Sequence, residues 1–339
     1  MIDFLTADRE AREGSILGLR PPRNTVDPFR PYGFFVEEEP RAGGGTDRVA
    51  TIFLTNRECP WRCLMCDLWK NTLEAPTPRG AIPAQMRFAL ERLPSANVLK
   101  LYNAGSFFDR AAIPWEDHGE IASLARGFER VVVECHPALA GDSSPRFRDL
   151  LGGPDLQVAL GLETAKEEIL GRLNKAMTVA DFENACRFLA AHAIGIRSFV
   201  LVGLPFLRKE EWPDATRASV DVSFRAGAEV VSLIPTRAGN GVMEELQRQG
   251  LFEPPTLLDL ETALEDLLEG KEGNPRSPGL VLTDLWNADA LDAPSCCGAA
   301  RVDRLRSMNL LQRNLPLPAC PSGCRHSTRP GGIRSSGET

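Results

Sequence analysis

Hydrophobic positions in this chain form short runs that alternate with longer amphipathic segments. Six mostly apolar runs predict β-strands, at residues 49–55, 97–103, 130–135, 156–163, 196–204 and 229–235. Most of these runs are nearly continuous, as is typical of parallel strands that are buried on both faces. Between the runs, apolar residues recur at helical spacing, most clearly in residues 84–93, 181–193 and 214–226. Strands that alternate with helices predict βαβ units around a parallel sheet.

Six such units predict an α/β fold, a partial (β/α)6 TIM-like barrel that is smaller than the closed eight-unit form. A further helix at residues 256–270 and a strand-like run at residues 280–286 follow the sixth unit. The Pro-, Gly- and charge-rich start of the chain predicts either a loop or an extension that covers another part. We therefore expect an N-terminal extension (1–47), a core barrel (48–290) and a Cys- and Arg-rich C-terminal extension (291–339).

Composition and charge narrow the class of protein. Hydrophobic residues make up 43% and charged residues 25%, which is ordinary for a globular chain. No apolar run approaches the ~18 residues that span a bilayer, and the N-terminus lacks an apolar signal region. We therefore expect a cytoplasmic protein that has no membrane partner. The net charge of −7 argues against a general nucleic-acid binder.

Charge is nevertheless distributed unevenly along the chain. Residues 301–339 carry seven arginines against two acidic residues, a local net charge of +5, which leaves −12 for residues 1–300. This basic tail either contacts a phosphate backbone or is a solvated terminus.

Nine cysteines without an export signal favour metal ligands or catalytic groups over disulfides. The segment TNRECPWRCLMCDLWK follows the first predicted strand and spaces its thiols as Cys59-x3-Cys63-x2-Cys66. Three thiolates on one loop can bind three irons of a cubane cluster and leave the fourth iron open. A structural zinc site normally takes four ligands, often from paired CxxC motifs. Zinc, or a fortuitous spacing, is the alternative interpretation.

CxxxCxxC after the first strand of an α/β barrel resembles the signature of the radical S-adenosylmethionine (SAM) superfamily. The resemblance implies a radical SAM barrel and an enzyme whose 4Fe–4S cluster, on Cys59, Cys63 and Cys66, reductively cleaves SAM to a 5′-deoxyadenosyl radical. These cysteines would then be both the metal ligands and the catalytic residues. An electron donor such as ferredoxin or flavodoxin is implied as a partner.

The resemblance extends to the ends of the other predicted strands. Met65 occupies the place where the superfamily usually has an aromatic residue near the adenine. The turn that contains Asn103, Gly105 and Ser106 corresponds to a Gly-Gly-Glu-type turn that binds the SAM amino group. This turn lacks the glutamate, so backbone carbonyls or Ser106 would accept those hydrogen bonds. The other SAM contacts that the resemblance implies are Glu134, Glu163, Arg197, Gly203 and Pro235. For the two glutamates the alternative is a solvent-facing strand end, and for Arg197 it is a surface position.

A second group of cysteines lies in the loop-rich C-terminal part and consists of Cys296, Cys297, Cys320 and Cys324. Four thiols in such a segment suggest a metal that holds the tail together. Zinc and an auxiliary iron–sulfur cluster both fit, and free thiols are the alternative. The two remaining cysteines, Cys135 and Cys186, are predicted to be buried core residues.

Further strings narrow the resemblance to one subgroup. CLMCDLWKN, YNAGSFFD, GLET, LNKAMT, FVLVGLPF and SLIPT, across about residues 48–270, resemble the β subunit of archaeosine synthase and the elongator-protein group. This similarity implies a tRNA, or a modified nucleobase of the deazaguanine kind, as the substrate. One alternative is radical modification of a peptide or small metabolite with an auxiliary cluster. Another is a zinc-binding interaction protein without catalysis.

Overall fold

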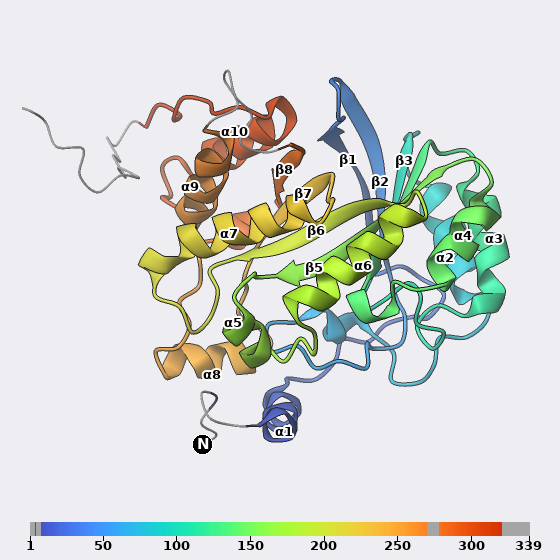
Figure 1. The fold of residues 1–339 in the computed structure, drawn as a ribbon, viewed down its shortest axis with the longest axis horizontal. Helices are drawn as coiled ribbons and strands as arrows, with labels where there is room; N and C mark the ends of the chain where they lie inside the picture. The colour runs from blue at the N-terminus through green and yellow to red at the C-terminus, as the bar shows by residue number, and fades with distance from the viewer. Residues whose placement is uncertain (1–3, 5–7, 270–277, 321–339) are drawn as a thin grey trace, which may run out of the picture.

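The computed structural model describes Phe4, residues 8–269 and residues 278–320. At its centre is one eight-stranded sheet, in which the strands follow each other in chain order from β1 to β8 (Figure 1). β1 (Gly33–Pro40) pairs antiparallel with β2, whereas all later neighbours are parallel. The seven parallel strands are β2 (Thr46–Leu54), β3 (Val98–Asn103), β4 (Arg130–Cys135), β5 (Asp155–Glu163), β6 (Gly195–Val202), β7 (Val230–Pro235) and β8 (Leu280–Thr283). The expected α/β barrel class is therefore confirmed.

Two features differ from the six-unit expectation. The strand-like run at 280–286 forms β8, a seventh parallel strand. The N-terminal region is not loop alone, because it contains α1 (Arg9–Leu19) and β1. β1 extends the sheet by pairing with β2 over eight residues, from Gly33 with Phe53 to Pro40 with Thr46.

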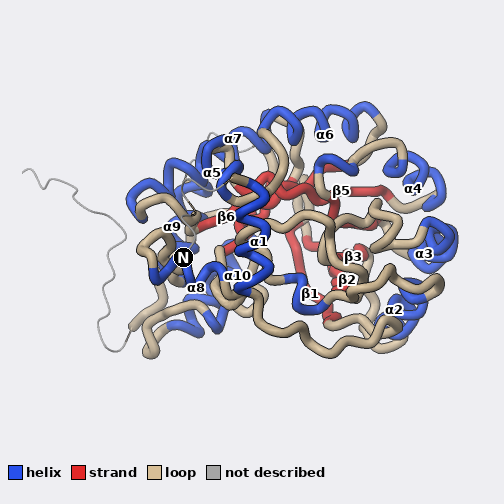
Figure 2. The backbone as a smooth tube through the Cα atoms, turned by 90° about the horizontal axis from the view of Figure 1, so that it is seen from below, coloured by secondary structure: helices blue, strands red, loops and turns tan. Residues whose placement is uncertain are grey.

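Helices cover the outer side of the curved sheet, as Figure 2 shows for α2, α3, α4, α6 and α7. The helices that follow successive strands are α2 (Ala81–Leu90), α3 (His118–Ala125), α4 (Ser143–Leu151), α6 (Val179–Ala191), α7 (Trp212–Arg225) and α9 (Leu257–Leu268). α6 and α9 each begin at a threonine that forms a capping box with the aspartate three residues later. The other helices are α5 (Glu167–Arg172), α8 (Val242–Arg248) and α10 (Gly298–Leu311). Within the described ranges, no helix is long and apolar enough to cross a membrane.

Strand residues alternate between a hydrophobic outer layer and the barrel interior, since successive side chains point to opposite faces. Residues such as Ile52, Leu101 and Val158 are fully buried in the outer layer against the helices. A small apolar cluster of Val49, Val98, Val132 and Ala159 lies on the other face. Cys135 and Cys186 are buried in the outer core, as predicted.

The barrel interior also contains a buried network of charges that β1 completes. Glu39 accepts hydrogen bonds from both terminal nitrogens of Arg197, at 3.0 and 2.7 Å, and from Lys100 Nζ at 2.5 Å. Lys100 also donates to Glu37, at 2.9 Å. Lys100 is 3% and Arg197 4% exposed, so Arg197 is not the surface residue of the alternative interpretation. Burial raises the pKa of Glu39, but the adjacent cations outweigh it and hold that pKa well below its usual range.

Removal of the Glu39 charge should destabilise the protein much more than removal of the charge of Glu38, which lies on the other face of β1. Glu39→Gln leaves Arg197 without its buried partner, and breaking a buried pair typically costs about 3–5 kcal/mol of unfolding free energy. Glu38 is exposed, so Glu38→Gln should change the unfolding free energy by less than about 0.5 kcal/mol. Denaturant unfolding of the two cluster-free variants measures the difference, and equal midpoints would contradict the interior network.

Candidate active site

One large cavity, with a volume of about 1030 Å³, runs through the barrel interior to the rim where the parallel strands end. Pockets for drug-sized ligands typically measure about 300–1,000 Å³. The lining includes ten of the expected site residues, namely Cys59, Cys63, Met65, Cys66, Asn103, Gly105, Glu134, Glu163, Arg197 and Pro235. The carboxyl rim is where α/β barrels place their active sites. The structure therefore brings the cysteine loop and four strand ends to one space.

The cysteine loop, residues 55–67, is held in place by backbone contacts with distant segments. Leu64 N donates to Leu173 O at 2.8 Å. The Asn240 side chain donates to Leu64 O at 2.8 Å and to Cys66 O at 3.1 Å. These bonds satisfy loop carbonyls that would otherwise need water, and they fix where the thiols lie.

A stacked pair of rings supports the loop from the barrel side. The ring of Trp61, between the first two cysteines, stacks on the imidazole of His136 at 3.8 Å between centroids and 9° between planes. His136 follows β4, and its Nε2 lies 2.9 Å from Lys175 O. Burial lowers the pKa of His136 to about 4, so the ring is neutral and packs as an aromatic group. The sequence left His136 without a role.

Gly105 allows the loop to approach β3. Its φ of +137° lies in the region that side chains rarely adopt, and a Cβ there would lie 2.9 Å from Cys59 Cβ. No real Cβ tolerates that approach, so the position requires glycine for steric as well as conformational reasons. The sequence assigned Gly105 to close backbone approach to SAM, whereas the structure places the cysteine loop itself against it.

The three thiols have the chemistry that a cluster requires. None of them forms a disulfide, and all three line the cavity. Burial raises the pKa of each thiol, that of Cys59 to about 12. Buried thiols of this kind lose their protons when they bind a metal. These residues therefore fit a cluster that faces the cavity.

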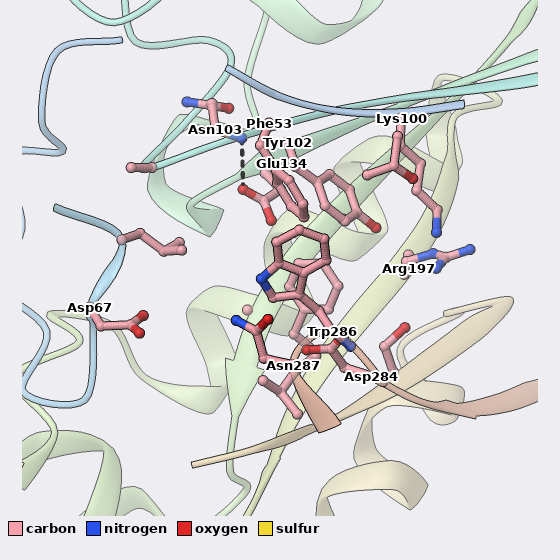
Figure 3. A pocket seen from close by; sticks show the side chains of 18 of the residues that line it. Phe53, Asp67, Lys100, Tyr102, Asn103, Glu134, Arg197, Asp284, Trp286 and Asn287 are labelled. Atoms are coloured by element: carbon pink, nitrogen blue, oxygen red, sulfur yellow. Dashed lines mark hydrogen bonds between the residues drawn. The ribbon is translucent and has the colours of Figure 1, made fainter. Parts of the chain in front are cut away.

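Asn103 and Glu134 present polar groups to the same cavity (Figure 3). Asn103 is 1% exposed, and within the described part of the chain neither polar atom of its side chain has a hydrogen-bond partner. Glu134 accepts a 3.0 Å hydrogen bond from the Asn103 backbone N–H. Burial raises the pKa of Glu134 to about 8. A cationic ligand beside it would favour the ionised carboxylate.

Glu163 ends β5 in a left-handed conformation, with φ of 64°, after an irregularity in the pairing of β5 with β6. Its carboxylate accepts a 2.5 Å hydrogen bond from Lys175 Nζ, and a Cβ on Gly161 would collide with both groups. Burial alone lowers the pKa of Lys175, but the carboxylate of Glu163 outweighs it and raises that pKa. Sequence reasoning did not single out Lys175, although the LNKAMT string contains it.

Two expected SAM contacts do not line the cavity. The Ser106 hydroxyl is buried and accepts a 2.6 Å hydrogen bond from the His136 backbone N–H. Gly203, with φ of +80°, packs against Pro255, whose ring carbons would lie 2.7 Å from an added Cβ. Arg197 does line the cavity, but Glu39 engages its guanidinium. Cys324 lies outside the described residues.

Aromatic side chains form much of the remaining wall, and the sequence did not predict this. Besides Trp61 and Trp69, the lining rings are Tyr32, Phe35, Phe53, Tyr102, Phe199 and Trp286. Trp286 stacks on Phe35 at 5.1 Å and meets Phe53 edge-on at 4.9 Å. It is 40% exposed, and Figure 3 shows it in the same space as Glu134 and Asp284. Burial raises the pKa of Asp284.

Comparisons with known proteins found similarities in sequence and in structure. No family model matches the chain. An uncharacterized protein of Methanocaldococcus jannaschii is 24% identical over 279 residues, which is 77% of this chain and 74% of that protein. Methylornithine synthase gives a TM-score of 0.51 at 13% identity, over 96% of this chain and 82% of that one. Coproporphyrinogen III oxidase from Escherichia coli, a radical SAM enzyme, gives a TM-score of 0.42 at 11% identity. That match covers 73% of this chain and 52% of the oxidase chain.

The likeness to methylornithine synthase spans almost the whole chain and concerns the fold. The chain shares the α/β barrel fold of methylornithine synthase, which agrees with the barrel that the alternating strands and helices predicted.

Gly105→Ala should prevent normal cluster assembly, because the new methyl group displaces Cys59. A matched control is Gly44→Ala, which also has a positive φ but has nothing within 4 Å of the added carbon. After anaerobic reconstitution we expect about four irons per chain in the wild type and the control, as one cubane requires. Gly105→Ala should hold well under half of that iron. Full iron content in this variant would contradict the close approach.

Proposed function

We propose that this protein is a radical SAM enzyme. Cys59, Cys63 and Cys66 hold a 4Fe–4S cluster, and SAM binds in the cavity beside it. The observation that carries the proposal is the convergence of three free thiols, the unpartnered Asn103 amide and the Glu134 carboxylate on one cavity. A zinc-binding protein without catalysis has no need for such a cavity.

When bound and reduced, the cluster supplies an electron that cleaves SAM to methionine and a 5′-deoxyadenosyl radical, which abstracts hydrogen from a substrate. The protein binds, orients and shields the reactants. Asn103 and Glu134 offer an acceptor and a negative charge to the SAM ammonium. Met65 and Pro235 offer apolar surface to the adenine. The aromatic wall keeps water away from the reacting atoms.

For the substrate, we propose a modified nucleobase of tRNA, of the deazaguanine kind. Flat heterocycles stack on aromatic side chains, and Trp286 and Phe53 provide such surfaces next to Glu134 and Asp284. A ferredoxin or flavodoxin is the proposed electron donor. The cytoplasm is the proposed location, because thiols that bind iron require a reducing compartment.

Anaerobically reconstituted protein, treated with dithionite and SAM, should produce 5′-deoxyadenosine. Cys63→Ala should abolish the product, because only two ligands remain for the cluster. The matched control is Cys186→Ala, which removes a fully buried core thiol on α6 and should retain the activity. Chromatography of the quenched reactions measures the product.

The same assay separates the chemistry from the substrate. Addition of tRNA that carries a 7-deazaguanine base should accelerate 5′-deoxyadenosine formation, whereas a peptide mixture should not. A cluster-loaded protein that forms no 5′-deoxyadenosine would overturn the enzyme proposal. Acceleration by peptides and not by tRNA would overturn only the substrate proposal.

A further inference from the structure

Three of the C-terminal cysteines meet at the start of α10. Cys297 is the N-cap residue of this helix, Cys296 precedes it, and Cys320 lies at the end of the described chain. Their sulfur atoms all lie within 4.8 Å of one another. Cys296 Sγ is 4.0 Å from Cys297 Sγ and 3.4 Å from Cys320 Sγ. Cys296 and Cys320 are 24 positions apart in the sequence, so the fold brings their thiols together.

The spacing of these sulfurs distinguishes between the metal groups that the sequence left open. In a tetrahedral site with Zn–S bonds of ~2.3 Å, neighbouring sulfurs lie about 3.8 Å apart. A disulfide would place two sulfurs about 2.0 Å apart. In a cubane each cysteine binds a different iron, so the sulfurs are spread farther. Among the described residues, the loop thiols at positions 59, 63 and 66 do not form such a close group, whereas the C-terminal thiols do.

A buried arginine of α10 contacts one of the three thiols. Arg301, one turn into α10, donates from Nε to Cys297 Sγ at 3.3 Å. Its side chain is 2% exposed and forms an ion pair with Glu261 of α9, which Arg304 also contacts at 3.0 Å. Side chains that contact a metal ligand, as Arg301 contacts Cys297, hold that ligand in its orientation.

α10 connects this site to the catalytic cavity. Its residues Arg306, Asn309 and Leu310 line the cavity. The Asn309 amide pairs with the backbone N–H and C=O of Thr283, both at 2.9 Å. The Gln312 amide pairs with Val281 in the same way, at 3.1 and 2.8 Å. α10 therefore covers the free edge of β8, which would otherwise present unpaired backbone groups.

We propose that Cys296, Cys297 and Cys320 bind one zinc ion, which anchors the start of α10 and thereby holds one wall of the cavity. These three thiols leave the fourth position of a tetrahedral zinc to another ligand, and the site is independent of the loop that binds the 4Fe–4S cluster. Cys324 is the remaining cysteine of the segment, and it lies outside the described residues.

Metal analysis of the full-length, anaerobically reconstituted protein tests the proposal. We expect one zinc and about four irons per chain in the wild type. The double variant Cys296→Ser/Cys320→Ser should lose the zinc and keep the iron. Cys63→Ala should lose the iron and keep the zinc, so failure of one site is distinguishable from failure of the other. Circular dichroism of the variants reports whether the barrel is folded.

Cobalt substitution gives a second measurement that leaves the proposed site intact. In the triple variant Cys59→Ser/Cys63→Ser/Cys66→Ser, stripped of zinc under reducing conditions, added Co²⁺ should give the intense visible bands of a tetrahedral thiolate site. Three results would overturn the proposal: about eight irons without zinc in the wild type, a Cys296–Cys320 disulfide in the purified protein, or no cobalt bands in the folded triple variant.

Discussion

Seven neighbouring strands run in the same direction, and this constraint determines where the functional groups can lie. Parallel strands place all their carboxyl ends at one rim, so groups far apart in the chain meet there. The cysteine loop follows β2, while Asn103 ends β3 and Glu163 ends β5. The loop can dock on this rim only because Gly105 has no side chain. A barrel with one reversed strand in this set would move a site residue to the opposite end.

The interior below the rim is charged. This is unusual, because α/β barrels normally fill their centre with branched apolar residues. β1 makes this interior possible, because Glu37 and Glu39 balance Lys100 and Arg197. The network joins β1 to β3 through Lys100 and to β6 through Arg197, so it connects strands that are not neighbours in the sheet. A buried pair of this kind gives little net stability but is costly to break. Among the cavity-lining carboxylates, Asp284 pairs with Arg237 at 3.1 Å, whereas Glu134 forms no salt bridge within the described residues.

Local pattern was sufficient to predict most of the fold and the cysteine loop. The apolar runs locate the parallel strands to within a few residues, and the spacing of three cysteines predicts the cluster loop without tertiary information. β1 was missed because FFVEEEP reads as a charged, Pro-terminated loop, and its glutamates make sense only opposite Lys100 and Arg197, 61 and 158 residues later. The Trp61–His136 stack and the aromatic wall depend on the same kind of distant pairing. The cysteine loop is thus a local feature, whereas its supports are long-range.

Electron paramagnetic resonance of the reduced, reconstituted protein tests the central claim most directly, because it reports on the iron that carries no cysteine. The loop supplies three cysteines, and a cubane has four irons. If the fourth iron is open to the cavity, SAM should change the shape and position of the cluster signal, and a SAM analogue without the methionine amino group should not. A fully loaded cluster whose signal is identical with and without SAM would contradict the claim that this site binds SAM at the cluster.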